Sequence, residues 1–314
     1  MRRPTFALLC AVVFFVGGNS AFAEQRKIGL LLKGRTAFWS TVEQGAKAAA
    51  AELGVELIVK TPPTESDVAI QIQQLNALAG QKVDCIIIAP TNGEALAQPA
   101  ASVAATGVKI IVLDSPLAGK AASVFIGTDH EAAGAAAGKL LASLVGDDDH
   151  VSVLRHSQGN LVTTAREDNA IAALKAGRPG VTIFSDVFLG NAKEEQEERA
   201  RLLLTKHPEV KAIMASSTPG TMTLLQLLAR AAKPGAVKLV GFGYNLNETA
   251  ATALANGTLH GWIAQLPLEM GRLGVKNAVA LLDGQNPPAV VHTDFRVVTK
   301  DNLPTPEVQA LLKL

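Results

Sequence analysis

Residues 27–54, KIGLLLKGRTAFWSTVEQGAKAAAAELG, contain the pattern that decides the fold. The first six residues form an apolar stretch of strand length. From Phe38 to Leu53 the apolar positions then fall three or four residues apart, which predicts an amphipathic helix, and Gly54 is typical of a helix end. This stretch therefore predicts a strand followed directly by a helix.

The same unit recurs along the rest of the chain. Further strands are predicted at 56–60, 83–89, 108–113, 123–126, 151–154, 181–187, 211–215 and 237–241, and helices at 66–79, 93–105, 130–145, 161–176, 192–207, 221–232 and 247–255. Continuous apolar strands separated by helices are typical of parallel sheets covered on both faces. The sequence thus predicts an α/β fold with two sheets of about five or six strands, one in each half.

The last 55 residues break this regularity. They predict a strand at 260–263, a helix at 268–282 and a strand at 290–298, the last preceded by Asn286-Pro287-Pro288. We expect the chain to cross back between the two halves here.

The N-terminus has the features of an export signal. Arg2 and Arg3 are followed by an apolar stretch from Phe6 to Phe15 and by Ala21-Phe22-Ala23, a small-x-small cleavage pattern. The apolar stretch is too short to span a bilayer. We therefore expect a signal peptide at residues 1–23, cleavage near Ala23, and a mature protein that works outside the cytoplasmic membrane.

Bulk composition excludes several function classes. Without Arg2 and Arg3 the chain has 27 basic and 28 acidic residues, so it has no excess positive charge to attract nucleic acid or an anionic membrane. A mature length of about 290 residues favours two domains. The hydrophobic content of 48% is typical of a globular protein with a buried core.

Residues that would indicate catalysis or metal binding are missing. The six histidines show no ligand spacing, and there is no nucleophile elbow and no phosphate-binding loop. Asp147-Asp148-Asp149-His150 is interpreted as a solvated turn rather than a metal cluster. Cys85, the one cysteine after the signal, lies in a fully apolar stretch and is interpreted as a packed thiol. We expect no catalytic residue, no metal and no cofactor.

Polar and aromatic residues instead gather where the predicted strands end. In open parallel sheets, ligands bind beyond these carboxyl ends. The residues found there are Lys33, Arg35, Phe38, Trp39, Asp114, Ser115, His156, Arg166, Ser217, Tyr244, Asn245 and Gln265. Aromatic faces together with carboxylate, guanidinium and amide groups suit a sugar, which has apolar C–H faces and many hydroxyls.

The chain resembles the ribose/galactose-type periplasmic binding proteins of ABC sugar importers. The resemblance lies in the export signal, the Phe38-Trp39 pair, Leu113-Asp114, and residues 263–267, IAQLP, and it covers essentially residues 26–300. It implies two Rossmann-like lobes that are joined by three crossovers and close over the ligand like a clamp. The lobes are expected at 24–129, completed by about 266–294, and at 130–265, completed by about 295–314.

The resemblance also implies roles for individual residues. Phe38 and Trp39 match the ring-stacking pair, Asp114 the carboxylate that takes paired hydroxyls, Arg166 the guanidinium of the second lobe, and Gln265 the hinge amide. Each of these also has a structural interpretation: a core turn for the aromatic pair, a turn cap for Asp114, a surface ion pair with Glu167 or Asp168 for Arg166, and a linker for Gln265. The predicted ligand-binding set is Phe38, Trp39, Asp114, Ser115, Arg166, Ser217, Asn245 and Gln265.

The chain departs from the ribose pattern at three positions. Ser115 stands where an arginine is expected, Ser217-Thr218 where an Asn-Asp pair is expected, and Gly243 where an aspartate is expected. A pentose or hexose in the usual pose would leave hydroxyls unpaired, which costs affinity. A sugar alcohol, a modified sugar or a sugar acid therefore stays open as the ligand.

The expected function is capture of such a small polar ligand by a monomer and its delivery to an ABC permease in the inner membrane. The alternative is a receptor of the same fold that signals to a chemoreceptor or histidine kinase. A transcriptional regulator is disfavoured by the export signal and by the lack of a basic N-terminal helix-turn-helix. A secreted α/β enzyme is disfavoured by the missing catalytic set.

Overall fold

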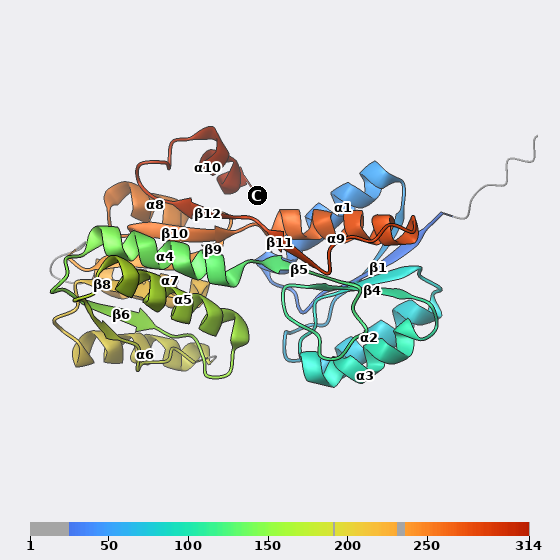
Figure 1. Cartoon of the computed structure of the whole chain (residues 1–314), viewed down its shortest axis with the longest axis horizontal. Helices are drawn as coiled ribbons and strands as arrows, with labels where there is room; N and C mark the ends of the chain where they lie inside the picture. Colours follow the sequence, from blue (N-terminus) through green and yellow to red (C-terminus); the bar gives the residue numbers. More distant parts are fainter. Residues whose placement is uncertain (1–24, 191, 231–235, 314) are drawn as a thin grey trace, which may run out of the picture.

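The computed structural model describes residues 25–190, 192–230 and 236–313. The expected signal peptide and its cleavage site lie outside these residues. Within them the chain forms two six-stranded sheets, each covered by helices, side by side along the long axis (Figure 1). This confirms the predicted α/β fold with two largely parallel sheets.

The first sheet and its helices, here called the N-terminal lobe, contain the first described residues of the chain. Its strands, in spatial order, are β11 (Val290–Thr293), β5 (Val124–Thr128), β4 (Lys109–Leu113), β3 (Cys85–Ile88), β1 (Lys27–Leu31) and β2 (Glu56–Lys60), all parallel. One face is covered by α1 (Ala37–Leu53) and α9 (Pro267–Leu282), the other by α2 (Val68–Gly80) and α3 (Gly93–Ala104). Cys85 is fully buried, and burial raises the pKa of its thiol to about 12, as fits a packed thiol.

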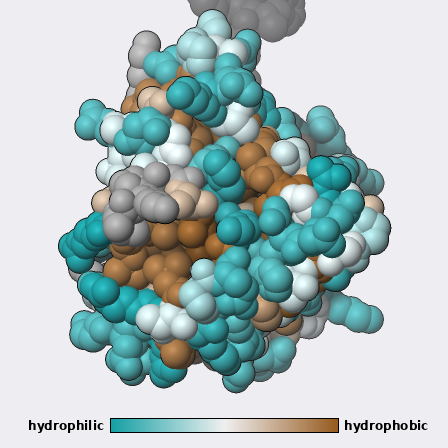
Figure 2. Space-filling view, turned by 90° about the vertical axis from the view of Figure 1, so that its left-hand side faces the viewer, coloured by the Kyte–Doolittle hydropathy of each residue, from teal (hydrophilic) through white to brown (hydrophobic). Residues whose placement is uncertain are grey.

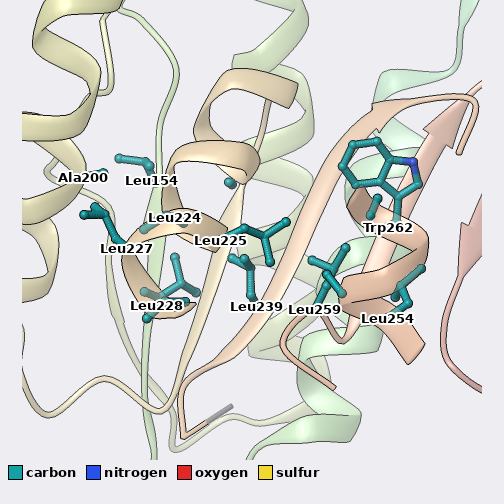
Figure 3. Close-up of a cluster of buried hydrophobic side chains, with 14 of the residues drawn as sticks. Leu154, Ala200, Leu224, Leu225, Leu227, Leu228, Leu239, Leu254, Leu259 and Trp262 are labelled. Atoms are coloured by element: carbon teal, nitrogen blue, oxygen red, sulfur yellow. The ribbon is translucent and has the colours of Figure 1, made fainter. Parts of the chain in front are cut away.

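The second sheet and its helices form the C-terminal lobe. Its strands, in spatial order, are β12 (Phe295–Val298), β10 (Gly261–Gln265), β9 (Lys238–Tyr244), β8 (Ala212–Ala215), β6 (His150–Leu154) and β7 (Thr182–Phe184), with β12 antiparallel to β10. One face packs against α4 (His130–Leu144) and α5 (Leu161–Gly177), the other against α6 (Lys193–Lys206), α7 (Thr218–Ala229) and α8 (Glu248–Asn256). Leucines of α7 and α8 and the ring of Trp262 fill the latter core (Figure 3).

The chain passes between the lobes three times. The crossings run from β5 to α4, from β10 to α9 and from β11 to β12. The prediction of a single strand at 290–298 was wrong. The segment is interrupted at Asp294, and its two halves join different sheets because β11 pairs with β5 while β12 pairs with β10.

Smaller differences lie at the edges of the C-terminal lobe. The predicted strand 181–187 is a regular strand only over Thr182–Phe184, although the Val187 carbonyl still accepts from the Arg155 backbone N–H at 3.1 Å. The sequence did not predict the short helix α10 (Pro306–Ala310). Seen from the end of this lobe, hydrophilic side chains surround patches of hydrophobic ones (Figure 2). Among the described residues, no helix combines the length and apolar character that a bilayer span requires.

Candidate ligand-binding site

A hollow of about 450 Å³ lies between the lobes at the carboxyl ends of the strands. Six of the eight predicted residues line it: Phe38, Trp39, Asp114, Arg166, Ser217 and Gln265. Other residues that line it are Lys33, Thr36, Glu65, Thr218, Pro219, Met222 and Tyr244. A larger hollow of about 980 Å³ adjoins it and shares Lys33 and Glu65, so the two form one cleft.

The aromatic wall of the hollow comes from the first turn of α1. Trp39 is 3% exposed and packs in the core, where its Nε1 donates to Oε1 of Glu65 at 2.8 Å. Phe38 is half-buried and lies edge-on to Trp39, with ring centroids 4.8 Å apart. Phe38 also meets Tyr244 of the C-terminal lobe edge-on at 5.4 Å. Trp39 is thus the core member of the pair, and Phe38 the ring that reaches across the cleft.

Asp114 follows β4 in a strained turn. Its φ is +64°, a left-handed conformation that non-glycine residues adopt at a cost of about 1–3 kcal/mol and that clusters at functional sites. Its carboxylate accepts from Nζ of Lys33 at 2.8 Å and from Ser115 Oγ at 2.9 Å, and Lys33 also reaches Ser115 Oγ. Burial alone would raise the pKa of Asp114, but the ammonium of Lys33 outweighs it and lowers the pKa to about 2. The carboxylate is therefore ionised and already paired.

Arg166 is held by three contacts in the C-terminal lobe. Its Nε donates to Nδ1 of His130 at 3.2 Å, its Nη1 donates to the Ser216 carbonyl at 3.0 Å, and its guanidinium lies 5.0 Å from the centroid of the Phe242 ring. The side chain is only 5% exposed. Burial lowers its pKa to about 10, so it stays charged at neutral pH.

The ion-pair alternative for Arg166 was wrong. Its neighbours on α5, Glu167 and Asp168, pair instead with Arg155, at 3.1 and 2.8 Å. Glu167 is buried and also accepts from Ser216 Oγ at 2.6 Å and from the His156 backbone N–H at 2.9 Å. Glu167 thereby connects the loops that follow β6 and β8. The second of these loops carries the Ser216 carbonyl that accepts from Arg166.

Ser217 lines the hollow on the side of the C-terminal lobe. Its hydroxyl lies 3.2 Å from Nδ1 of His156 and accepts weakly from the Gly220 backbone N–H, at 3.4 Å, as the N-cap of α7. Burial and the charge of Arg166 lower the pKa of His156. The imidazole is therefore uncharged at neutral pH and offers a hydrogen bond rather than a positive charge.

Gln265 lies where β10 leaves the C-terminal lobe. Its Nε2 donates to the Gly243 carbonyl at 3.3 Å, and its Oε1 is 3.5 Å from the hydroxyl of Thr128 on another crossover. Thr128 in turn lies 3.3 Å from Thr293 on the third crossover. Gln265 is thus connected both to the hollow and to the residues that hold the three crossovers together.

Two predicted residues lie outside this hollow. Ser115 lines the larger adjoining hollow and contacts Lys33. Asn245 is buried behind the wall in a left-handed conformation, φ +46°, and its Oδ1 has no hydrogen-bond partner within the described ranges. Its backbone carbonyl accepts from Nε1 of Trp262 at 2.7 Å, so its backbone serves the packing of that ring.

Other residues line the hollow without having been in the predicted set. Glu65 lies within the loop between β2 and α2 rather than directly after the strand, so the strand-end rule that selected Asp114 did not indicate it. The sequence indicates Lys33 and Arg35 only as cations near the strand end. Lys33 lines the hollow, whereas Arg35 lines a separate hollow on the N-terminal lobe. At Gly243, a Cβ would lie 1.8 Å from the Trp262 ring, so that ring occupies the space of the aspartate that the resemblance expected.

The lowered pKa of His130 predicts that the folded protein loses stability in acid. Burial, reinforced by the charge of Arg166, lowers this pKa from 6.5 to about 3. Between these values the unfolded chain binds the proton and the folded protein does not, so stability falls as the pH falls through this window. We expect the free energy of unfolding at pH 5 to be about 2 kcal/mol below that at pH 7 on this account.

Urea unfolding of the wild type and of His130→Asn over this pH range measures the effect. The variant lacks the imidazole, so its stability should depend less steeply on pH. His156 and His260 also have lowered pKa values and act in the same direction in both proteins. Parallel pH profiles of the two proteins would contradict the assignment to His130.

The cleft is lined by side chains of both lobes. No group of three or more histidine, cysteine, aspartate or glutamate side chains is placed to hold a metal ion within the described part of the chain. The profile of the periplasmic binding protein domain matches residues 28–286.

Two curated relatives cover nearly the whole chain. The D-allose-binding periplasmic protein of Escherichia coli is 26% identical over 88% of this chain and 89% of its own length. The ribose import binding protein of Haemophilus influenzae is 26% identical over 96% of this chain and 100% of its own length. An ABC transporter solute-binding protein of Agrobacterium vitis, solved with α-D-tagatopyranose, superposes with a TM-score of 0.80 at 26% identity over 92% of this chain and 99% of its own. The chain belongs to the periplasmic binding protein family.

Proposed function

We propose that this protein is a periplasmic solute-binding protein that captures a sugar or sugar derivative between its lobes and delivers it to an ABC import permease. One observation carries the proposal: an aromatic ring and a carboxylate from one lobe, a guanidinium from the other and the Gln265 amide at a crossover line the same hollow. The names of the relatives, which bind allose, ribose and tagatose, support it. No bond needs to be made or broken in this role.

The charges in the hollow favour a neutral ligand. The side chains with a formal charge that line it are two cations, Lys33 and Arg166, and two carboxylates, Asp114 and Glu65, so their formal charges cancel. Lys33 is already paired with Asp114, and Glu65 accepts from Trp39. A neutral sugar or polyol pairs its hydroxyls with these groups without adding charge. A sugar acid would add a carboxylate that must compete for Arg166.

A thermal-shift screen of residues 24–314 against sugars, polyols, sugar acids and nucleosides tests the proposal. A ligand that binds only the folded state stabilises it by about 2.7 kcal/mol at one hundred times its Kd. We expect a rise in Tm of several degrees for a neutral sugar or polyol. A rise only with sugar acids would contradict the neutral class, and no response across the panel would contradict the carbohydrate-receptor function.

The proposed function requires the lobes to close. We place the lobe boundaries at 24–129 with about 266–294 and at 130–265 with about 295–314. We also expect a monomer that is released into the periplasm by cleavage near Ala23.

Apolar side chains of both lobes face the larger hollow. Leu161 is 71% exposed and lines this hollow together with Pro116 and Leu117 of the other lobe. Closure that hides these apolar side chains gains free energy, at about 25 cal/mol for each Å² of apolar surface removed from water.

Closure gives a prediction for solution scattering. The radius of gyration should decrease when the ligand found in the screen is added at saturation, because the two lobes approach each other around the hollow. Small-angle X-ray scattering with and without ligand measures this change. A sugar without effect on Tm serves as the control, and an unchanged radius with the ligand demonstrably bound would contradict the clamp.

A further inference from the structure

His130 and Arg166 are brought together by close helix packing. At Gly134 on α4, a Cβ would lie 2.4 Å from the backbone oxygen of Arg166, and at Gly138 a Cβ would lie 2.2 Å from that of Ala170. The two helices therefore touch through their backbones. Residues four apart share a helix face, so His130 lies on the face of Gly134, one turn earlier. The Arg166 side chain meets the imidazole there.

The hydrogen bond between them fixes the state of the imidazole. A guanidinium N–H can only donate, so Nδ1 of His130, at 3.2 Å from Arg166 Nε, must be the unprotonated acceptor. The ring is then neutral with its proton on Nε2. That nitrogen is buried and has no hydrogen-bond partner within the described ranges. The charged groups that act on the ring are Arg166, Lys33, His292 and Asp114, and its pKa of about 3 keeps it neutral at any ordinary pH.

The contacts of Arg166 leave both N–H groups of Nη2, and the second N–H of Nη1, for a ligand. Nε is occupied by His130 and Nη1 by the Ser216 carbonyl, while Nη2 makes no hydrogen bond within the described ranges. Arginine is long and flexible, and fixing it before the ligand arrives reduces the entropy cost of binding. His130 is moreover the first residue of α4, directly after a crossover. It therefore fixes Arg166 relative to the point about which the lobes move.

We propose that His130 is a positioning residue: its Nδ1 holds the guanidinium of Arg166 so that Nη2 faces the ligand. This inference rests on the proposed function, because its consequence is read in ligand affinity. His130 itself makes no ligand contact. A positioning residue needs a hydrogen-bond acceptor at the place of Nδ1 and affects the ligand only through Arg166. A purely structural residue would meet neither condition.

Nuclear magnetic resonance of the ligand-free protein tests the arrangement independently of any ligand. In long-range ¹H–¹⁵N spectra, His130, assigned by its absence in His130→Asn, should show an unprotonated Nδ1 and a protonated Nε2 from pH 5 to pH 8. A proton on Nδ1, or a ring that titrates in this range, would overturn the proposal. This readout remains decisive even if the screen finds no ligand.

Affinities of three variants test the consequence. His130→Asn keeps an acceptor near the position of Nδ1 and should bind within about two-fold of wild type. His130→Leu removes it and should bind on the order of tenfold more weakly, the equivalent of about 1.4 kcal/mol. The matched control is His260→Leu, because Nδ1 of His260 also accepts a hydrogen bond, from the Leu239 backbone N–H at 3.3 Å, away from the cleft. The control should bind normally.

A double-mutant cycle separates positioning from direct contact. In an Arg166→Ala background, His130→Leu should cause no further loss of affinity, because the residue through which it acts is gone. An equal loss in both backgrounds would overturn the proposal, as would equal losses in His130→Asn and His130→Leu. Each variant is first checked by its unfolding midpoint, and if His130→Leu does not fold, His130→Ala, which also lacks an acceptor, takes its place in the cycle.

Discussion

Replacing Arg166 by alanine weakens ligand binding by about 1.5–3 kcal/mol, the range for a lost hydrogen bond to a charged group. This corresponds to roughly ten- to 150-fold in Kd. The effect is large because the guanidinium is preorganised, with His130 and the Ser216 carbonyl already fixing two of its nitrogens. Its removal also opens space against the Phe242 ring. Isothermal titration calorimetry with the ligand found in the screen measures the change.

Arg178→Ala provides a matched control at the C-terminal end of the same helix. Arg178 follows the last residue of α5 and donates from Nε to the Val145 carbonyl at 2.8 Å, much as Arg166 donates to a carbonyl near the other end. Its loss should lower stability but leave affinity unchanged, because it lies outside the residues that line the cleft. Unchanged affinity in Arg166→Ala would remove Arg166 from the binding site.

The sequence was sufficient to predict the architecture because each strand–helix unit is encoded locally. The segment Lys27–Gly54 shows this. Its apolar stretch forms β1, its apolar period of three to four residues forms α1, and its terminal glycine, Gly54, ends the helix in a left-handed conformation, φ +67°. The segment 290–298 shows the limit. Its apolar pattern indicates strand throughout, but which sheet each half joins depends on pairing with β5 and β10, partners far away in sequence. Local periodicity does not contain that information.

Residues that line the cleft were predictable where they end a strand or directly follow one. Asp114 directly follows β4 and Gln265 ends β10, although their ligand contacts remain predictions. Asn245 also follows a strand, yet its left-handed backbone leaves the side chain behind the wall, and sequence does not encode that direction. The contact of Arg166 with His130 depends on how closely α4 and α5 pack, a distance that three-dimensional packing sets.

Gly271→Ala should lower the free energy of unfolding by about 3 kcal/mol, at the upper end of the usual cost of overpacking. The reason is the close contact of α1 and α9, which lie side by side on one face of the N-terminal lobe (Figure 1). A Cβ at Gly271 would lie 1.9 Å from the Val42 carbonyl oxygen, and one at Gly45 would lie 1.9 Å from that of Leu268. Backbone atoms cannot move aside as a side chain can, so the helices must separate. Urea unfolding measures the loss.

Gly274→Ala, one turn further along α9, is the matched control. A Cβ there would meet only side chains, the nearest being Ile87 at 3.3 Å, and alanine gains about 1 kcal/mol in helix propensity over glycine. Its stability should therefore stay close to that of the wild type. The helix contact also affects the cleft, because Phe38 and Trp39 lie in the first turn of α1, and Leu266 alone separates Gln265 from the start of α9. Separating these helices moves the aromatic wall away from the crossover amide, so Gly271→Ala should weaken ligand binding as well. Equal stabilities for the two variants would mean that the backbone contact between α1 and α9 does not set this geometry.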